Sequence, residues 1–234
     1  MPPSQFALPI YIDLSATFLY GLTGALLAIR RQYDFIGVFV LALVTGLGGA
    51  LIRDGIFIQS GPPAAMLDPR YLGMILVGCV VAAFFRNRIA GLVEVFIWAD
   101  ALGLGAYAVV GAARALGAGL SIPASVMVGI INATGGGLLR DVLVREEPLL
   151  LKPGQFYVVA ALMAAVLFCN LVARLNVPLE RAALLSIGAS FVFRVLAIVF
   201  NWKTVAVAEQ ISASAEQPVR AGTGQKPGTK SERQ

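Results

Sequence analysis

The sequence predicts an all-α, multi-pass membrane protein with seven transmembrane helices, arranged as two inverted three-helix repeats plus a seventh helix. Composition gives the class: 58% of the 234 residues are hydrophobic and only 13% are charged, against about 25% charged in soluble domains. The mean hydropathy is +0.82. The apolar residues fall into runs close to the ~20 residues that cross a bilayer. A glycine-rich phrase that ends in Arg-Asp occurs twice, which indicates the repeats.

The doubled phrase fixes the alignment of the two repeats. Residues 46–54 read GLGGALIRD and residues 133–141 read ATGGGLLRD, an offset of 87. The same offset aligns further identical residues, namely Asp13 with Asp100, Tyr20 with Tyr107, Gly24-Ala25 with Gly111-Ala112 and Ala28 with Ala115. These matches involve Gly, Ala, Tyr, Arg and Asp rather than interchangeable aliphatic residues, which indicates an internal duplication. Three helices per repeat is an odd number, so the two copies are expected to lie upside down relative to one another.

The first repeat, about residues 10–88, is predicted to hold three helices. They are expected at about residues 9–29, 35–57 and 71–85. Asp13 lies near the start of the first helix, Arg30-Arg31 end it, and Pro69 introduces the third. Each run is close to the length that spans the hydrocarbon core, allowing for tilt.

The second repeat, about residues 96–174, follows the same order. Its helices are expected at about residues 93–113, 122–143 and 155–173, and a seventh helix without a repeat partner at about 182–202. Residues 1–203 are therefore expected to form one transmembrane domain. Residues 204–234 are rich in Ser, Gly, Pro, Gln and Lys without periodicity, which predicts a disordered cytoplasmic tail.

Loop charge predicts the orientation in the cell (inner) membrane. One set of loops and the tail carry most of the basic residues, namely Arg30, Arg31, Arg86, Arg88, Arg145, Lys152, Lys203, Arg220, Lys226, Lys230 and Arg233. The other loops hold only Arg70, Arg114, Arg174 and Arg181. Because basic loops stay on the cytoplasmic side, the N-terminus is expected outside and the C-terminus in the cytoplasm. This placement accounts for the net charge of +5 without a nucleic-acid partner.

The polar inventory argues against an enzyme. The chain has no histidine and two cysteines, and both cysteines, Cys79 and Cys169, lie in apolar runs. No His-based triad, no activated nucleophile with a base and no metal cluster can be assembled from the pattern. The sequence therefore predicts no cofactor and no protein-bound metal.

The glycine clusters predict kinks in the second and fifth helices. They lie at Gly48 and Gly49 and at Gly135, Gly136 and Gly137. An interrupted helix frees backbone carbonyls, which are tolerated at membrane depth only where they are buried in protein or line water, and carbonyls bind cations. The alternative interpretation is that these small residues simply permit close helix packing.

Several polar residues at membrane depth have two interpretations each. Arg53-Asp54 and Arg140-Asp141 either form structural ion pairs or face the permeation path, and Asp13 and Asp100 are interfacial residues or line the pore. Thr45, Asn132 and Thr134 are expected to make interhelical hydrogen bonds. Arg194 is expected to snorkel, to face the bundle or to take part in gating.

The sequence resembles the bacterial branch of the trimeric intracellular cation (TRIC) channel family. The resemblance rests on the Asp-Tyr-Gly-Ala residues before each glycine cluster, the doubled Gly-Gly-x-Leu-x-Arg-Asp phrase, the prolines that precede each third helix, and the extra seventh helix. The resemblance covers about residues 10–203. It implies a homotrimer in the bilayer with one potassium-permeable pore per subunit, formed around the second and fifth helices, through which potassium or sodium ions pass. One departure is that the first repeat has Ala50 where the second has Gly137.

A second function class remains open on the sequence alone. Some bacterial proteins with this doubled motif resemble carriers for a small solute such as glycine, and inverted repeats with broken helices suit alternating access as well as a fixed pore. Discrete single-channel currents indicate a channel, whereas slow, saturable flux indicates a carrier.

Overall fold

The computed structural model describes residues 8–85, 89–152 and 156–202, and every regular element within these ranges is helical. Their bounds are α1 Ile10–Arg30, α2 Phe35–Ile52, the π-helix η2 Arg53–Ile58, α3 Ala64–Leu67, α4 Pro69–Phe85, α5 Ile89–Gly117, α6 Ile122–Leu143, α7 Tyr157–Ala173 and α8 Leu179–Val199. The predicted tail, residues 204–234, and the domain boundary at residue 203 lie outside the described residues.

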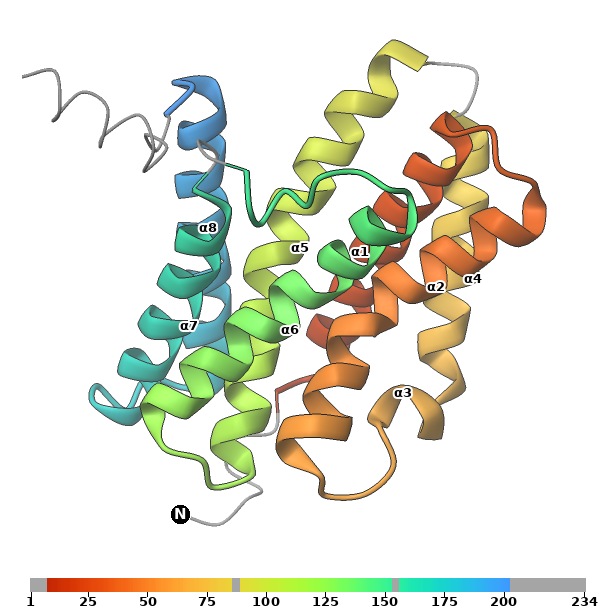
Figure 1. Ribbon diagram of the computed structural model, residues 1–234. Coiled ribbons are helices and arrows are strands. Elements are labelled where there is room, and N and C mark those ends of the chain that lie inside the picture. The colour runs from red at the N-terminus through yellow and green to blue at the C-terminus, as the bar shows by residue number, and fades with distance from the viewer. Residues whose placement is uncertain (1–7, 86–88, 153–155, 203–234) are drawn as a thin grey trace, which may run out of the picture.

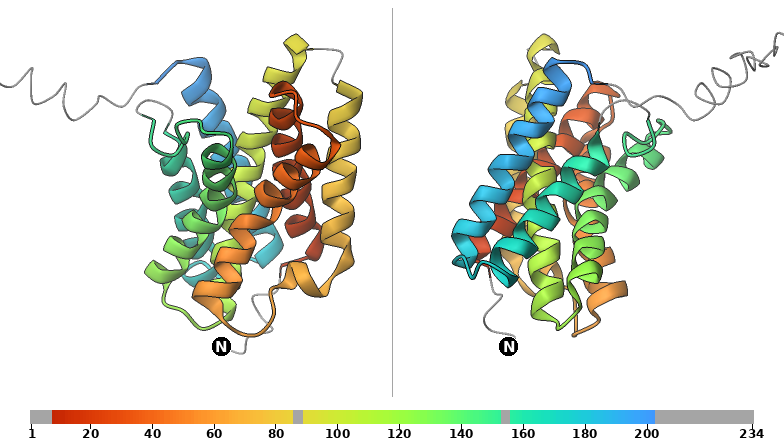
Figure 2. Two further views of the ribbon diagram at one scale, coloured as in Figure 1. Left: turned by 45° about the vertical axis from the view of Figure 1, so that its right-hand side comes forward. Right: turned by 90° about the vertical axis from the view of Figure 1, so that its left-hand side faces the viewer.

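The helices form two groups that meet along one seam (Figure 1). Within the first group α1, α2 and α4 contact one another, and within the second α5, α6 and α7 do the same. The groups are joined where α1 packs on α5 and α2 packs on α6, while α8 packs on α5 and α7. Figure 2 shows α7 and α8 on one flank of the bundle and α4 on the other.

Small residues set the spacing between these helices. In the second group Ala160, Ala161, Ala164 and Ala165 are all fully buried on α7, where they belong to a cluster that includes Phe168. Helices inside a bilayer associate through such small residues, because lipid tails offer no hydrophobic force that would drive larger apolar side chains together. The repeated alanines therefore allow α7 to lie close to its neighbours.

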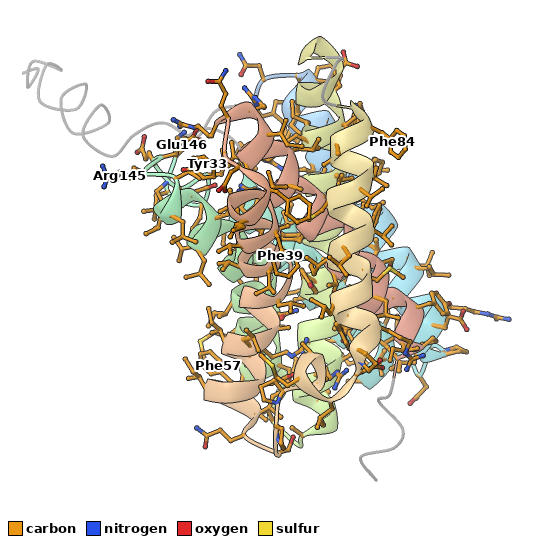
Figure 3. All side chains as sticks on the ribbon, turned by 90° about the vertical axis from the view of Figure 1, so that its right-hand side faces the viewer. Tyr33, Phe39, Phe57, Phe84, Arg145 and Glu146 are labelled. Carbon is orange, nitrogen blue, oxygen red and sulfur yellow. The ribbon has the colours of Figure 1, made fainter. Side chains whose placement is uncertain are left out.

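The outside of the bundle is apolar. Phe35 and Phe84 are 80% and 82% exposed, and Figure 3 shows Phe84 projecting away from the helices. Five helical segments among the described residues are long and apolar enough to cross a membrane, and two shorter apolar helices cover residues 69–84 and 157–173. An aqueous protein rarely exposes this much apolar surface. The chain is a multi-pass membrane protein.

Capping residues explain several helix boundaries. The Asp34 carboxylate accepts a 2.8 Å bond from the Gly37 amide at the start of α2, which satisfies one of the unpaired amides of the first turn. Asp68 precedes α4 and accepts bonds from the Arg70 amide and guanidinium. The side-chain bond from Arg70 holds the pKa of the Asp68 carboxyl below its usual range.

The predicted boundaries agree with the structure to within four residues, with four corrections. The predicted fourth helix, α5, covers Ile89–Gly117 rather than 93–113. The predicted third helix starts at Pro69 rather than residue 71, because Asp68 caps it. The single turn α3 was not predicted. The seventh helix covers Leu179–Val199 rather than 182–202, since Pro178 precedes its first turn and the chain leaves the helix after Phe200.

The kinks predicted at the glycine clusters do not interrupt the helices. α2 is continuous through Gly48 and Gly49, and α6 is continuous through Gly135, Gly136 and Gly137. Keeping the helical hydrogen bonds avoids releasing backbone groups where water cannot satisfy them. The hydrogen-bond pattern changes only after the first cluster, where the helix becomes a π-helix at Arg53.

The glycines serve instead to bring two backbones together. A Cβ atom on Gly49 would overlap the Asn132 carbonyl oxygen of α6, and one on Gly136 would overlap the Thr45 carbonyl oxygen of α2. A Cβ atom on Gly137 would meet nothing closer than the Tyr157 hydroxyl at 3.4 Å, an ordinary contact. This difference explains why the first repeat tolerates alanine at residue 50, the counterpart of Gly137.

Gly136→Ala should therefore destabilise the folded protein by about 1–3 kcal/mol, because overpacking forces the backbones of α2 and α6 apart. Gly137→Ala is the matched control, with the same change of residue one position along, and should shift stability by less than about 1 kcal/mol. Thermal unfolding in detergent measures both. Equal melting temperatures for the two variants would contradict the close contact.

Candidate functional site

Two buried tyrosines tie the halves of the molecule together near the α2–α6 contact. The Tyr20 hydroxyl of α1 donates to the Ala133 carbonyl of α6 at 2.5 Å, and the Tyr107 hydroxyl of α5 donates to the Gly46 carbonyl of α2. Donors and acceptors are both related by the offset of 87. The two rings lie 5.0 Å apart between centroids. Each tyrosine therefore crosses from its own repeat to the backbone of the other.

The first Arg–Asp pair lies at the end of α2. Arg53 donates to both carboxylate oxygens of Asp54, through Nε at 2.6 Å and through a terminal nitrogen at 2.9 Å. Its other terminal nitrogen reaches the Asn132 side chain on α6 at 3.4 Å. Asp54 also accepts a bond from the Ala64 amide at 3.2 Å. The pair therefore fixes both the α2–α6 contact and the start of α3.

The second pair repeats this arrangement at the end of α6. Arg140 donates through Nε to Asp141 at 2.8 Å and through a terminal nitrogen to the Thr23 hydroxyl of α1 at 3.2 Å. Asp141 accepts a bond from the Leu149 amide at 3.0 Å. The guanidinium also lies 4.8 Å from the centroid of the Phe96 ring, within the range of a cation–π contact. Both arginines are almost completely buried.

Asp13 is buried near the start of α1 and takes its partners from two other helices. Its Oδ2 atom accepts bonds from the Tyr71 hydroxyl of α4 at 2.7 Å and from Arg114 of α5 at 3.1 Å. The other oxygen, Oδ1, has no hydrogen-bond partner among the described residues. Asp13 is therefore held between helices rather than on the outside of the bundle.

Asp100, the counterpart of Asp13, also lies beside a tyrosine and an arginine, but its arginine comes from a different position in the repeat. Its Oδ1 atom lies 3.4 Å from the Tyr157 hydroxyl and 3.5 Å from Arg140. Arg194 of α8, which is 3% exposed, lies with its guanidinium 5.0 Å from the centroid of the Tyr157 ring. Arg194 thus faces the bundle, as one of its three interpretations predicted.

The smaller polar residues agree with the prediction only in part. The Asn132 side chain donates to the Tyr107 carbonyl of α5 at 2.7 Å, so its interhelical role is confirmed. The Thr45 and Thr134 hydroxyls donate to carbonyls four residues earlier in their own helices. The expectation that they bond to other helices is wrong, because a carbonyl of the preceding turn has a second lone pair and lies within reach of a threonine hydroxyl.

Two cavities that contain charged side chains lie at opposite ends of α1, one lined by residues near its start and the other by residues near its end. The large cavity, about 740 Å³, is lined among others by Asp13, Asp54 and Arg114. The small cavity, about 370 Å³, is lined among others by Arg140 and Asp141. The glycine contact and the two tyrosines lie between them, fully enclosed by protein.

The mouth of the small cavity carries an exposed ion pair. Arg31 and Glu146 both line this cavity and are bonded to each other. Figure 3 shows Glu146 and Arg145 close to Tyr33 at this end of the molecule. Among the described residues, no group of three His, Cys, Asp or Glu side chains is arranged to hold a metal ion.

The two tyrosines are functional candidates that the sequence reasoning did not assign to the site. Tyr20 and Tyr107 were matched only as part of the repeat alignment. Their identity at the offset of 87 was the available signal, because a tyrosine buried in a membrane helix needs a partner for its hydroxyl.

This fold defines a class: a multi-pass helical membrane protein with buried ion pairs and one charge-containing cavity on each side of a closely packed centre. Comparison with known proteins gives the family. A family model described as "Glycine transporter" matches residues 10–87 and 97–173.

Relatives and solved structures agree with this match. A UPF0126 membrane protein of Deinococcus radiodurans is 35% identical over 156 residues, which cover 66% of this chain and 72% of the relative's length. The UPF0126 inner membrane protein YadS of Escherichia coli K12 is 29% identical over a region that covers 82% of this chain and 93% of the relative's length.

The structure of the TRIC trimeric intracellular cation channel orthologue from Rhodobacter sphaeroides superimposes with a TM-score of 0.76 at 34% identity, covering 82% of this chain and 97% of that chain. A prokaryotic TRIC channel crystallised in 0.5 M KCl gives 0.75 at 26% identity, covering 82% and 96%. The chain belongs to the bacterial branch of the TRIC channel family.

Breaking one buried pair should cost much more than breaking the exposed one. Asp141→Asn leaves the buried Arg140 with its charge less compensated, so the free energy of unfolding should fall by about 3–5 kcal/mol. Glu146→Gln, which removes the partner of the half-exposed Arg31, should cost at most about 1 kcal/mol. Thermal unfolding in detergent compares the two variants. Similar losses would show that burial does not govern these ion pairs.

Proposed function

We propose that the protein is a monovalent cation channel, permeable to potassium, whose pathway runs within each subunit between α2 and α6. The observation that carries this proposal is the pair of cavities on either side of the α2–α6 contact, each of which contains the aspartate of an Arg-Asp phrase. The solved relatives described as TRIC cation channels support the same function.

Conduction requires the centre of the molecule to open. The pathway between the cavities is occupied by the glycine contact and by Tyr20 and Tyr107. If α2 and α6 separate, the Gly46 and Ala133 carbonyls that accept the tyrosine hydroxyls become available as oxygen ligands, the groups that replace a cation's hydration shell. The glycines thus act as pore residues through close approach rather than through helix breaks.

The same proposal includes seven membrane spans in two inverted repeats. α1, α2 and α4 form one repeat, α5, α6 and α7 the other, and α8 is the seventh span. The hydrogen bonds of Tyr20 and Tyr107 support this arrangement, since both donors and acceptors are related by the offset of 87. In this arrangement the two Arg-Asp phrases lie on opposite sides of the membrane, as inverted repeats require.

We further propose that three copies assemble as a homotrimer with one pore each. The description of the Rhodobacter sphaeroides relative as trimeric supports this state. Residues of α1, η2, α3 and α5 line the large cavity, and residues of α1, α5 and α6 line the small one. Because all of these belong to one chain, a subunit needs no neighbour to complete its pathway. Residues 1–203 form the channel domain, with a cytoplasmic tail after it.

The N-out, C-in orientation in the inner membrane predicts which loops a membrane-impermeant thiol reagent reaches. Both native cysteines are buried, so introduced cysteines dominate the signal. Ser60→Cys, after η2, should be labelled in intact cells, and Glu147→Cys, after α6, only after permeabilisation. Labelling of Glu147→Cys alone in intact cells would reverse the assignment.

Channel and carrier functions are separated by recordings from purified protein in planar bilayers. The carrier alternative rests on the description of the family model, "Glycine transporter", and the channel on the solved relatives. We expect discrete unitary potassium currents, no saturable glycine uptake into proteoliposomes, and a mass in detergent of three chains. Saturable uptake without unitary currents would replace the channel by the carrier, and protein-free membranes provide the control.

A further inference from the structure

The two cavities are built from equivalent positions but differ in one charge. Residues 27 and 114 are related by the offset of 87, and each lines the cavity of its own end: Leu27 the small cavity and Arg114 the large one. Asp141 and Asp54 are related in the same way and also line these cavities. Arg114 is therefore a cation that the second repeat adds to the large cavity at a position where the first repeat has an aliphatic residue.

Arg114 also differs from the other arginines around the buried aspartates in its exposure. Its side chain is 41% exposed although it bonds to Asp13, whose side chain is 5% exposed. The arginine beside Asp100 is Arg140, whose side chain is 1% exposed. The charge that compensates Asp100 is thus enclosed in protein, whereas the charge that compensates Asp13 faces the cavity.

The charge balance of the large cavity depends on this one residue. The charged residues lining it are Asp13, Asp54 and Arg114. Asp54 is neutralised by two hydrogen bonds from Arg53, so Arg114 and Asp13 decide the remaining charge. With Arg114 present they cancel. Without it, Asp13 keeps only the neutral Tyr71 hydroxyl as its short-range partner, and the cavity becomes anionic.

We propose that Arg114 is a specificity-determining residue that lowers the local concentration of cations in the large cavity, so that potassium enters more slowly from this side than Asp13 alone would allow. The proposal rests on the channel function proposed above. A cavity with low-dielectric walls focuses the field of the charges that line it, and one unit charge changes the local concentration of a permeating ion several-fold. Salt screens this effect, with a Debye length of about 30 Å at 0.01 M and about 3 Å at 1 M.

The test replaces Arg114 by the residue that the first repeat has at this position. Arg114→Leu should raise the unitary potassium conductance for ions entering from the large cavity about two- to five-fold at 10 mM KCl, and should leave it near wild type at 1 M KCl. Arg114→Lys, which keeps the charge, should restore wild-type conductance at low salt. The double variant Asp13→Asn/Arg114→Leu, which is neutral again, should do the same.

Arg70→Leu is the matched control for a general surface-charge effect. Arg70 belongs to the same end of the molecule, since it begins α4 directly after α3, but it is bonded to Asp68 and does not line the cavity. Its removal should leave the low-salt conductance within about 1.5-fold of wild type. If Arg114→Leu does not fold as judged by thermal unfolding, Arg114→Gln carries the same test, because it is neutral and keeps a hydrogen-bond donor for Asp13.

The outcomes separate this proposal from the channel function itself. Currents from the wild type together with unchanged low-salt conductance in folded Arg114→Leu and Arg114→Gln would overturn the role of Arg114 and leave the channel intact. An increase that persists at 1 M KCl would also overturn it, because an effect of local charge must be screened. Absence of unitary currents from the wild type would overturn both.

Discussion

The contact between the backbones of α2 and α6 is the constraint on which the rest of the structure depends. Gly49 and Gly136 each face a carbonyl of the other helix so closely that a single methyl group does not fit. Because the helices touch there, the ends that diverge from the contact leave room for a cavity on either side. The same approach brings Arg53 within reach of Asn132 across the two helices. The close approach of α2 and α6 therefore accounts both for the backbone packing at the glycines and for the Arg53–Asn132 hydrogen bond.

Burial of charge is the second consequence of this geometry. In a membrane protein an ionised side chain has little water to solvate it, so each charge needs a partner inside the fold. The Arg-Asp phrases meet this need locally, with both charges on adjacent residues. Their remaining hydrogen-bonding groups are then available to hold neighbouring segments, as Asp54 and Asp141 do for the amides of Ala64 and Leu149. The aspartate of a charge pair near a helix end thus also fixes the following segment through a hydrogen bond to a backbone amide.

Hydrophobic length and the doubled phrase were sufficient to predict the helices and the pairing of their positions, and α6 was predicted with its observed bounds. The role of the glycines was predicted less well. A run of glycines lowers helix propensity, and propensity alone favours a break at residues 48–49. The deciding factor is tertiary, because the loss of propensity is offset by a helix that packs directly on the glycines. The amino-acid sequence alone does not show which helix packs against the glycines.

The interactions of the site residues, too, could be predicted where the partners are adjacent in sequence and not where they are far apart. Arg53-Asp54 and its counterpart could be predicted as ion pairs, because the two charges are adjacent in sequence. The bonds of Asp13 to Tyr71 and Arg114 join residues 58 and 101 positions apart, and no local pattern indicates them. Thr45 and Thr134 were expected to bond to other helices, but the preceding turn of their own helix offers a nearer acceptor.

The tyrosine bonds have a consequence for how the two halves can change over time. Tyr20 and Tyr107 donate to main-chain carbonyls, at Ala133 and at Gly46, and every residue type provides such a carbonyl. The acceptor positions already differ in their side chains, and the bond is present in both halves. The side chain of the acceptor residue therefore takes no part in the bond, whereas substitution at a donor removes it. For this bond alone, the two halves need the same residue type only at the donor position.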